Sequence, residues 1–223
     1  MTVLRSRSFI SDAVALIARE SESAISARGI FRIALSGGNT PRPVYEALSA
    51  AGLPWGEWEV TFSDERCVPP DSEQSNFQMA KRALFDRAAI PAANILRMEG
   101  ERDPAVAAES YERTLLARSD PYRHDLILLG MGDDGHTASL FPGTAALGIT
   151  DRLVAANFVP KFSTWRLTFT YPLLNAARHV CFLVGSAGKE PVLEGVFSGS
   201  SGYPSAAVTP TEGDVTWLLG GGA

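Results

Sequence analysis

Residues 125–143 read DLILLGMGDDGHTASLFPG, and they join an apolar run to a glycine-rich polar turn. The run from Asp125 to Gly130 is continuous in apolar character, which is typical of a parallel strand that is covered on both faces. Glycines at positions 130, 132 and 135 allow a contorted turn that most other residues would resist. We therefore predict a buried strand whose carboxyl end opens into a polar loop.

The same order of strand, turn and helix recurs along the chain. Further strands are expected at 30–35, 58–64, 94–98, 166–170, 179–185 and 215–219, and helices at 11–28, from Pro41 with Thr40 as its cap, and at 76–87, 104–118 and 189–197. Alternating strands and helices predict an α/β fold, with a mainly parallel sheet and helices on both faces. Ligands of such sheets bind beyond the carboxyl ends of the strands.

The composition sets limits on the class of protein. The chain of 223 residues has 45% hydrophobic and 20% charged residues and no apparent repeat, so we expect a single domain over residues 1–223. No apolar run approaches the roughly 20 residues of a membrane span, and no secretory leader is recognisable, so a cytoplasmic protein is expected. A net charge of -5 argues against nucleic-acid binding. Cys67 and Cys181 lack metal-ligand spacing and are expected to be buried or half-buried free thiols.

The first candidate motif is SGGNT, at Ser36, Gly37, Gly38, Asn39 and Thr40. It follows an expected strand and opens a helix, where free N–H groups and the helix dipole favour an anion such as phosphate. The alternative is a tight turn that needs glycine for a positive φ.

The second motif is SDERC, residues 63–67, at the end of the expected strand 58–64. Its charged residues must reach solvent in a cleft or pair with one another. Arg66 suits an anion, because its planar guanidinium matches phosphate oxygens, whereas a surface ion pair with Asp64 or a neighbour is the alternative. The loop that follows, residues 69–76, is polar and long enough to fold over the site.

The third motif, within residues 130–143, carries Asp134 and His136 two positions apart. Histidine has an ordinary pKa of about 6.5 and accepts a proton at neutral pH, so His136 is the candidate catalytic base. Asp134, rather than Asp133, is the expected partner, and it could orient the imidazole ring or hold a hydroxyl of the ligand. The alternative is a helix-entry turn in which the aspartates cap backbone amides. The other two histidines, His124 and His179, lie beside expected strands and are interpreted as structural.

The fourth motif is GSAGK, residues 185–189, which is not a Walker loop because its spacing differs. Lys189 at a helix start is unfavourable for the helix dipole unless an anion neutralises it. Arg166 is either a further cationic contact or a solvated strand-end residue. A required metal is not expected, because three ligands from one turn rarely surround an ion and no second histidine or cysteine has ligand spacing.

Five segments together resemble the ordered motifs of the 6-phosphogluconolactonases, within a wider family that also contains glucosamine-6-phosphate isomerases, or deaminases. The segments are SGGNTP, SDER with a later SN, GMGDDGHTASLFP, RLTFTYPLLNAA and FLVGSAGKEPVLEGV, and they extend from Leu35 to about Val196. The resemblance implies a modified Rossmann-type fold. It also implies hydrolysis of 6-phospho-D-glucono-1,5-lactone to 6-phosphogluconate, in the oxidative pentose phosphate pathway, without a cofactor.

The resemblance implies a role for each motif. His136 would activate a water that attacks the lactone carbonyl, with Asp134 positioning His136 or the sugar, and the loop 36–40, Arg66 and Lys189 would hold the phosphate. The expected substrate-binding residues are Ser36, Gly37, Gly38, Asn39, Thr40, Asp64, Arg66, Gly132, Arg166 and Lys189. The expected partner is a small phosphorylated sugar lactone, with no nucleic acid or membrane, and the chain is expected to be a monomer or a weak homodimer.

Two other functions are considered. The related deaminases carry an acidic residue five positions after the histidine, where this chain has Phe141, so the sequence favours lactone hydrolysis over deamination. A sugar-phosphate sensor without turnover is the second, and it has no need for the titratable pair of Asp134 and His136.

Overall fold

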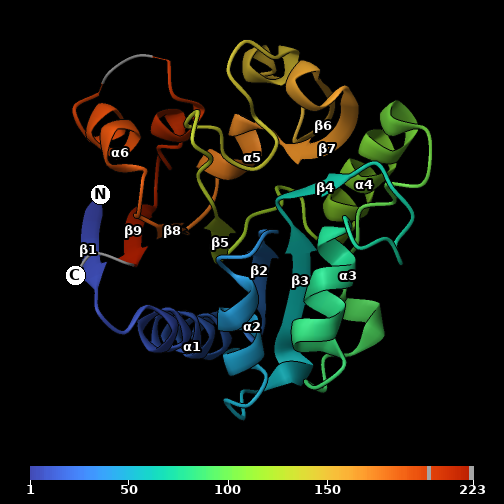
Figure 1. Ribbon diagram of the computed structural model, residues 1–223. Coiled ribbons are helices and arrows are strands. Elements are labelled where there is room, and N and C mark those ends of the chain that lie inside the picture. The colour runs from blue at the N-terminus through green and yellow to red at the C-terminus, as the bar shows by residue number, and fades with distance from the viewer. Residues whose placement is uncertain (200–201, 221–223) are drawn as a thin grey trace.

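The computed structural model describes residues 1–199 and 202–220, and a six-stranded sheet runs through its centre (Figure 1). In this part of the chain the strands are β1 (Thr2–Ser6), β2 (Phe31–Leu35), β3 (Trp58–Phe62), β4 (Asp64–Arg66), β5 (Leu126–Leu129), β6 (Val154–Val159), β7 (Thr164–Phe169), β8 (His179–Gly185) and β9 (Asp214–Gly220). The helices are α1 (Phe9–Arg28), α2 (Arg42–Leu48), α3 (Asn76–Ala80), α4 (Pro104–Arg118), α5 (Tyr171–Asn175) and α6 (Glu190–Phe197). The central sheet has the order β1-β9-β8-β5-β2-β3 with all pairs parallel, which confirms the predicted α/β class.

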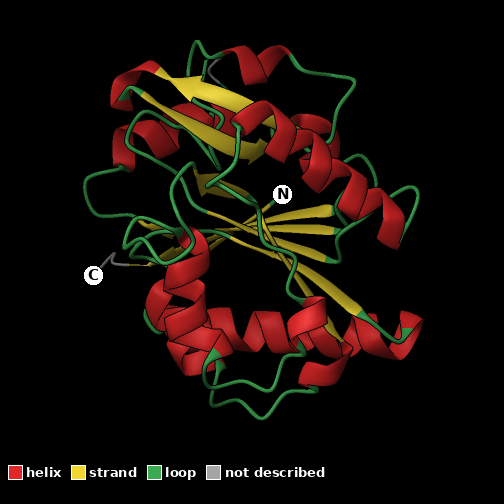
Figure 2. Ribbon diagram, turned by 90° about the vertical axis from the view of Figure 1, so that its right-hand side faces the viewer, coloured by secondary structure: helices red, strands yellow, loops and turns green. Residues whose placement is uncertain are grey.

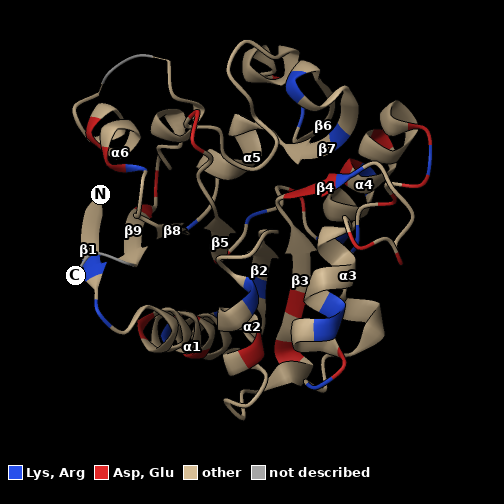
Figure 3. Ribbon diagram, in the orientation of Figure 1, with Lys and Arg blue, Asp and Glu red and all other residues tan. Residues whose placement is uncertain are grey.

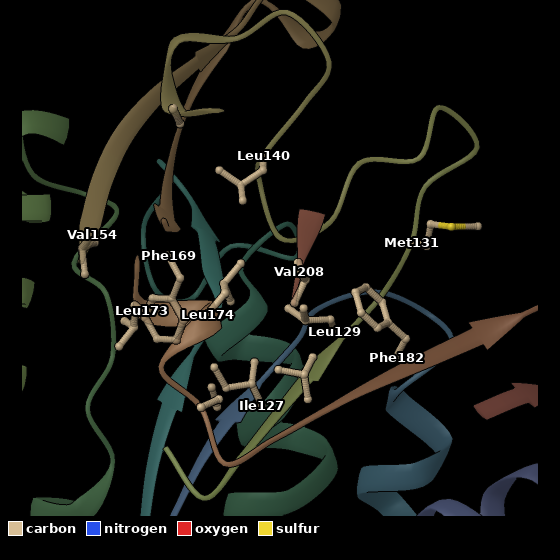
Figure 4. Close-up of a cluster of buried hydrophobic side chains, with 14 of the residues drawn as sticks. Ile127, Leu129, Met131, Leu140, Val154, Phe169, Leu173, Leu174, Phe182 and Val208 are labelled. Atoms are coloured by element: carbon tan, nitrogen blue, oxygen red, sulfur yellow. The ribbon is translucent and has the colours of Figure 1, made fainter. Parts of the chain in front are cut away.

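The central sheet is covered on both faces, as Figure 2 shows with the strands seen nearly edge-on. Successive side chains of a strand point to opposite faces, and in β5 they enter two separate hydrophobic clusters. Ile127 and Leu129 pack with residues of α4, α5, α6, β6 and β7, in the cluster drawn in Figure 4. Leu126 and Leu128 pack against α1 and α2. The continuous apolar run of β5 is thus explained by burial on both sides.

A second, three-stranded sheet lies over one face of the first, with the antiparallel order β4-β7-β6 (Figure 2). The segment 166–170, expected in the parallel sheet, belongs instead to β7. Its pairing with β6 across a tight turn at Pro160–Phe162 gives an antiparallel hairpin, which the alternation of strands and helices could not reveal.

Two further local predictions from the sequence were wrong. Residues 94–98 form one bridge, between Ile95 and Val60, and no strand, since the Leu96 carbonyl accepts a hydrogen bond from the Tyr111 hydroxyl. Thr40 does not cap α2: Pro41 holds the cap position and the helix begins at Arg42. Strands β1, β4 and β6 and helix α5 were not anticipated.

Both cysteines are free, as expected, Cys181 buried and Cys67 half-buried. Burial raises the pKa of the Cys181 thiol to about 12 and that of Cys67 to about 11, so both are protonated near neutral pH. In the part of the chain that the structure describes, none of the helices has the length and apolar character needed to cross a membrane.

A buried carboxylate joins the amino ends of the strands, opposite the edge where the polar loops lie. Glu59 in β3 is 2% exposed and accepts a hydrogen bond from the Tyr122 hydroxyl at 2.9 Å. Its carboxylate also pairs with Arg32 at 3.2 Å and with Arg118 at 3.7 Å. Removing one partner of such a group leaves the others buried without compensation.

We expect Glu59→Ala to lower the free energy of unfolding by about 3 kcal/mol, because Arg32 and Tyr122 lose their buried acceptor. Urea denaturation measures this change. Glu57→Ala, which removes an exposed carboxylate two residues away, is the control and should change stability by less than about 0.5 kcal/mol. Equal stabilities of the two variants would contradict the structural role of Glu59.

Candidate active site

The four sequence motifs meet at one edge of the central sheet. Strands β8, β5, β2 and β3 are neighbours in the sheet, and each is followed at its carboxyl end by one of the motifs. A cleft of about 340 Å³ lies there. Of the predicted site residues, Ser36, Gly37, Gly38, Asn39, Thr40, Asp64, Arg66, Gly132, His136, Arg166 and Lys189 line it. Asp134 does not line the cleft, but its carboxylate contacts Nδ1 of His136.

The loop after β5 folds tightly around the His136 ring. The Gly132 amide donates to the His136 carbonyl at 2.9 Å, and the Thr137 hydroxyl donates to the Gly130 carbonyl at 2.8 Å. A Cβ atom at Gly132 would lie 2.0 Å from the imidazole Cε1, so no larger residue fits while the ring keeps this place. The glycine at this position is therefore explained by close approach, and not by an unusual φ.

His136 is held through one of its ring nitrogens. Its Nδ1 lies 2.5 Å from Oδ1 of Asp134, and the same oxygen accepts the His136 backbone N–H at 3.2 Å. Because an ionised carboxylate accepts hydrogen bonds, the ring proton belongs on Nδ1 and leaves Nε2 free to accept one. Asp133 is a different case, with its side chain 87% exposed and 3.7 Å from the Lys189 amine. Asp134 is thus the histidine's partner, as predicted.

A lysine from the second sheet completes this arrangement. Lys161, in the turn between β6 and β7, donates to Oδ2 of Asp134 at 2.8 Å. Burial raises the pKa of Asp134, but the hydrogen bonds from Lys161 and His136 outweigh it, and the net pKa lies well below the usual value. The carboxylate is therefore ionised throughout the neutral range.

Aromatic rings pack against the other side of His136. Phe141 stacks on the imidazole with 3.9 Å between ring centroids and 22° between planes, and Phe162 meets Phe141 edge-on at 5.8 Å. Phe141 stands where the related deaminases are expected to carry an acidic residue. In this protein the position supports the ring by an apolar contact and brings no charge to it.

The glycine turn after β2 admits another side chain into the cleft wall. A Cβ atom at Gly37 would lie 1.8 Å from Oδ1 of Asn76, and Gly38 has a φ of +103°. The Ser36 backbone is tied to the Tyr45 hydroxyl at both its N–H and its carbonyl, whereas the buried Ser36 hydroxyl has no partner among the described residues. The Ser36 hydroxyl at the cleft wall is thus available to a ligand.

Two arginines face each other across β4 and β7. Arg66 and Arg166 are paired in register, so their side chains lie on the same side of the second sheet. Within the described chain neither guanidinium forms an ion pair with a carboxylate, and the buried Nε of each has no hydrogen-bond partner. Burial, and then the charge of Arg66, lower the pKa of Arg166. Figure 3 shows β4 as a charged strand, in contrast with the uncharged β5.

The acidic residues beside Arg66 are already engaged. Glu65 is 3% exposed and accepts four hydrogen bonds, from the Ser75 hydroxyl and from the backbone N–H groups of Arg66, Asn76 and Phe77. Asp64 accepts from the Ser139 hydroxyl at 2.7 Å and from the Asn76 amide at 3.1 Å. These contacts fix the end of loop 69–76 against the cleft. They also explain why neither carboxylate neutralises the arginine pair.

Lys189 also lines the cleft, at the start of α6. Its Nζ donates to the Met131 carbonyl at 2.5 Å, which ties the loop after β8 to the loop after β5. The Lys189 side chain is 22% exposed, and it lines the cleft together with His136.

The remaining histidines lie outside the cleft, as expected. His124 is fully buried, with Nε2 2.8 Å from the Thr61 hydroxyl, and burial lowers its pKa to about 3. His179 contacts Thr216 and Glu20 at the far end of β8. No cluster of three or more His, Cys, Asp or Glu side chains suited to a metal ion is present in residues 1–199 and 202–220.

Sequence reasoning missed part of the cleft. Asn76, Ser139 and Phe162 line it and Lys161 contacts Asp134, and none of the four was among the expected site residues. Lys161 and Phe162 come from a turn of the second sheet that no glycine turn or expected strand end marks. Asn76 and Ser139 lie in quoted motifs, SN and GMGDDGHTASLFP, but were given no role of their own. Asn76 was correctly predicted at the start of a helix, which Ser75 caps, but a helix start alone does not indicate a ligand site.

Comparisons with known proteins agree with this geometry. The family model described as glucosamine-6-phosphate isomerases/6-phosphogluconolactonase matches residues 5–217. The 6-phosphogluconolactonases of Nostoc sp. and Synechocystis sp. are 46% and 44% identical to the chain; each alignment covers 94% of it and 93% and 90% of the relative. The crystal structure of 6-phosphogluconolactonase from Thermotoga maritima superposes with a TM-score of 0.91 at 32% identity, covering 99% of both chains. The chain therefore belongs to the glucosamine-6-phosphate isomerase/6-phosphogluconolactonase family.

Proposed function

We propose that this protein hydrolyses 6-phospho-D-glucono-1,5-lactone to 6-phosphogluconate, with His136 as general base. One observation carries the proposal: a histidine with a free Nε2 faces the same cleft as two arginines that have no carboxylate partner. A base supplies what ester hydrolysis needs, and unpaired cations supply what a phosphate needs. The names of the relatives at 44–46% identity point to the same reaction.

In the proposed mechanism His136 Nε2 removes a proton from a water molecule as its oxygen attacks the lactone carbonyl. The tetrahedral intermediate then collapses, the bond between the carbonyl carbon and the ring oxygen breaks, and the imidazolium returns its proton to that oxygen. Asp134 stays ionised throughout, orients the ring and stabilises the imidazolium. No cofactor takes part in these steps.

The phosphate of the substrate is proposed to bind between Arg66 and Arg166, near the loop 36–40 and Lys189. Two guanidinium groups on the same side of one antiparallel pair repel each other, so a dianion between them relieves an unfavourable arrangement. Binding at this end presents the lactone ring to His136 and makes the attack effectively intramolecular.

Phe141 supports hydrolysis over deamination. A deaminase of this family is expected to place a carboxylate at this position, whereas here a phenyl ring stacks on the base at 3.9 Å. The cytoplasmic location and the monomeric or weakly dimeric state remain predictions from the sequence.

We expect His136→Ala to reduce turnover by at least about 100-fold, because the proton acceptor is lost. The measurement is a time course of freshly generated lactone over the uncatalysed background. His179→Ala also removes a histidine, but outside the cleft, and should retain near-normal turnover per folded molecule. Normal turnover of His136→Ala would exclude it as the base.

Asp134→Asn should also reduce turnover, by roughly 10²- to 10⁴-fold. Lys161 will attract the amide oxygen, so the amide NH₂ faces Nδ1 and the ring proton moves to Nε2, where it blocks catalysis. Asp133→Asn, in the same loop but 87% exposed, is the control and should lose less than about threefold. Similar losses in both variants would indicate a general effect of charge in this loop.

Arg166→Met should raise the KM for the phosphorylated lactone by about 10- to 100-fold, because the phosphate loses a charge-assisted hydrogen bond. Steady-state kinetics with unphosphorylated glucono-1,5-lactone should show no comparable change. Arg113→Met, at an exposed position of α4, is the matched control. An equal effect on both lactones would place the phosphate elsewhere.

A further inference from the structure

The turn between β6 and β7 connects the second sheet to the catalytic pair. Lys161 in this turn reaches Oδ2 of Asp134 at 2.8 Å, while Oδ1 of the same carboxylate holds His136 Nδ1 at 2.5 Å. The three side chains thus form a continuous chain of polar contacts from one sheet to a loop of the other. Lys161 itself is 54% exposed and does not line the cleft.

Packing and backbone geometry hold the turn in place. Ser163 has a φ of +48°, and its N–H donates to the Pro160 carbonyl at 3.1 Å, which closes the turn. The ring of Phe162 packs edge-on against Phe141, which in turn stacks on His136. The lysine therefore approaches Asp134 from a defined position.

The charges around His136 come from several elements. Asp134 on its own loop favours the protonated ring, and Lys161 from the turn opposes that effect. Asp133 on the same loop is offset by Lys189 from the start of α6. Asp64, Arg66 and Arg166 line the same cleft as His136. Of these groups, Lys161 is the cation closest to the carboxylate that acts directly on the ring.

We propose that Lys161 is a positioning residue that acts through Asp134: it fixes the rotation of the carboxylate and offsets its charge, so that Asp134 orients the His136 ring without placing an uncompensated negative charge beside it. The kinetic consequence rests on the proposed function. The effect on the titration of His136 does not, since it follows from the contacts alone.

The test is the pH dependence of kcat/KM for Lys161→Met. Loss of the positive charge should move the acid limb to higher pH by about half a unit, the effect of one unit charge two contacts away in a water-like dielectric. Lys161→Arg should restore the wild-type limb. Lys81→Met removes a lysine that is also paired with an aspartate and similarly exposed, at 46%, and should leave the limb unchanged.

A second measurement follows the His136 ring by NMR in the same variants without substrate, and its titration midpoint should rise by the same amount in Lys161→Met. If the titration midpoint of His136 does not move in Lys161→Met, the proposal is overturned. The proposal is also overturned if Lys161→Met changes only the KM, because Lys161 would then be a substrate contact. If wild-type protein fails to hydrolyse the lactone while the midpoint still shifts, the proposed function fails and the inference about Lys161 stands.

Discussion

Burial of β5 on both faces determines where chemistry is possible in this molecule. Its side chains alternate between two hydrophobic clusters, so the strand has no room for a polar group until Gly130. The neighbouring strands β2 and β8 are also mostly buried, and the polar residues of the cleft follow their carboxyl ends, whereas Arg32 and His179 lie toward their amino ends. The cleft lies at the edge of the sheet where the chain leaves several buried strands and reaches solvent.

The second sheet supplies what the first cannot. Strands of the central sheet bring the base and the glycine turns, whereas β4, β7 and the turn after β6 bring Arg66, Arg166 and Lys161. Antiparallel strands with one solvated face tolerate charged side chains that have no partner, whereas the covered parallel sheet holds a charge such as Glu59 only with compensating partners. The division of residues between the two sheets follows from this difference in environment.

The parts of the site that depend on local patterns could be predicted from the sequence. The glycines and the spacing of Asp134 and His136 mark one loop, and that loop folds as expected. The antiparallel sheet could not be predicted, because pairing of Arg66 with Arg166 joins segments 100 positions apart. Lys161 was missed for the same reason: its surroundings read as an ordinary loop, and its importance appears where the turn meets Asp134 in space.

The facing arginines of β4 and β7 also link ligand binding to folding. Without an anion, the folded chain holds two like charges side by side, a cost that the unfolded chain does not bear. Any anion that binds between them favours the folded state in proportion to its occupancy, by about 2.7 kcal/mol at a concentration 100 times its dissociation constant. The thermal stability of the protein therefore becomes a direct reporter of occupancy, independent of turnover.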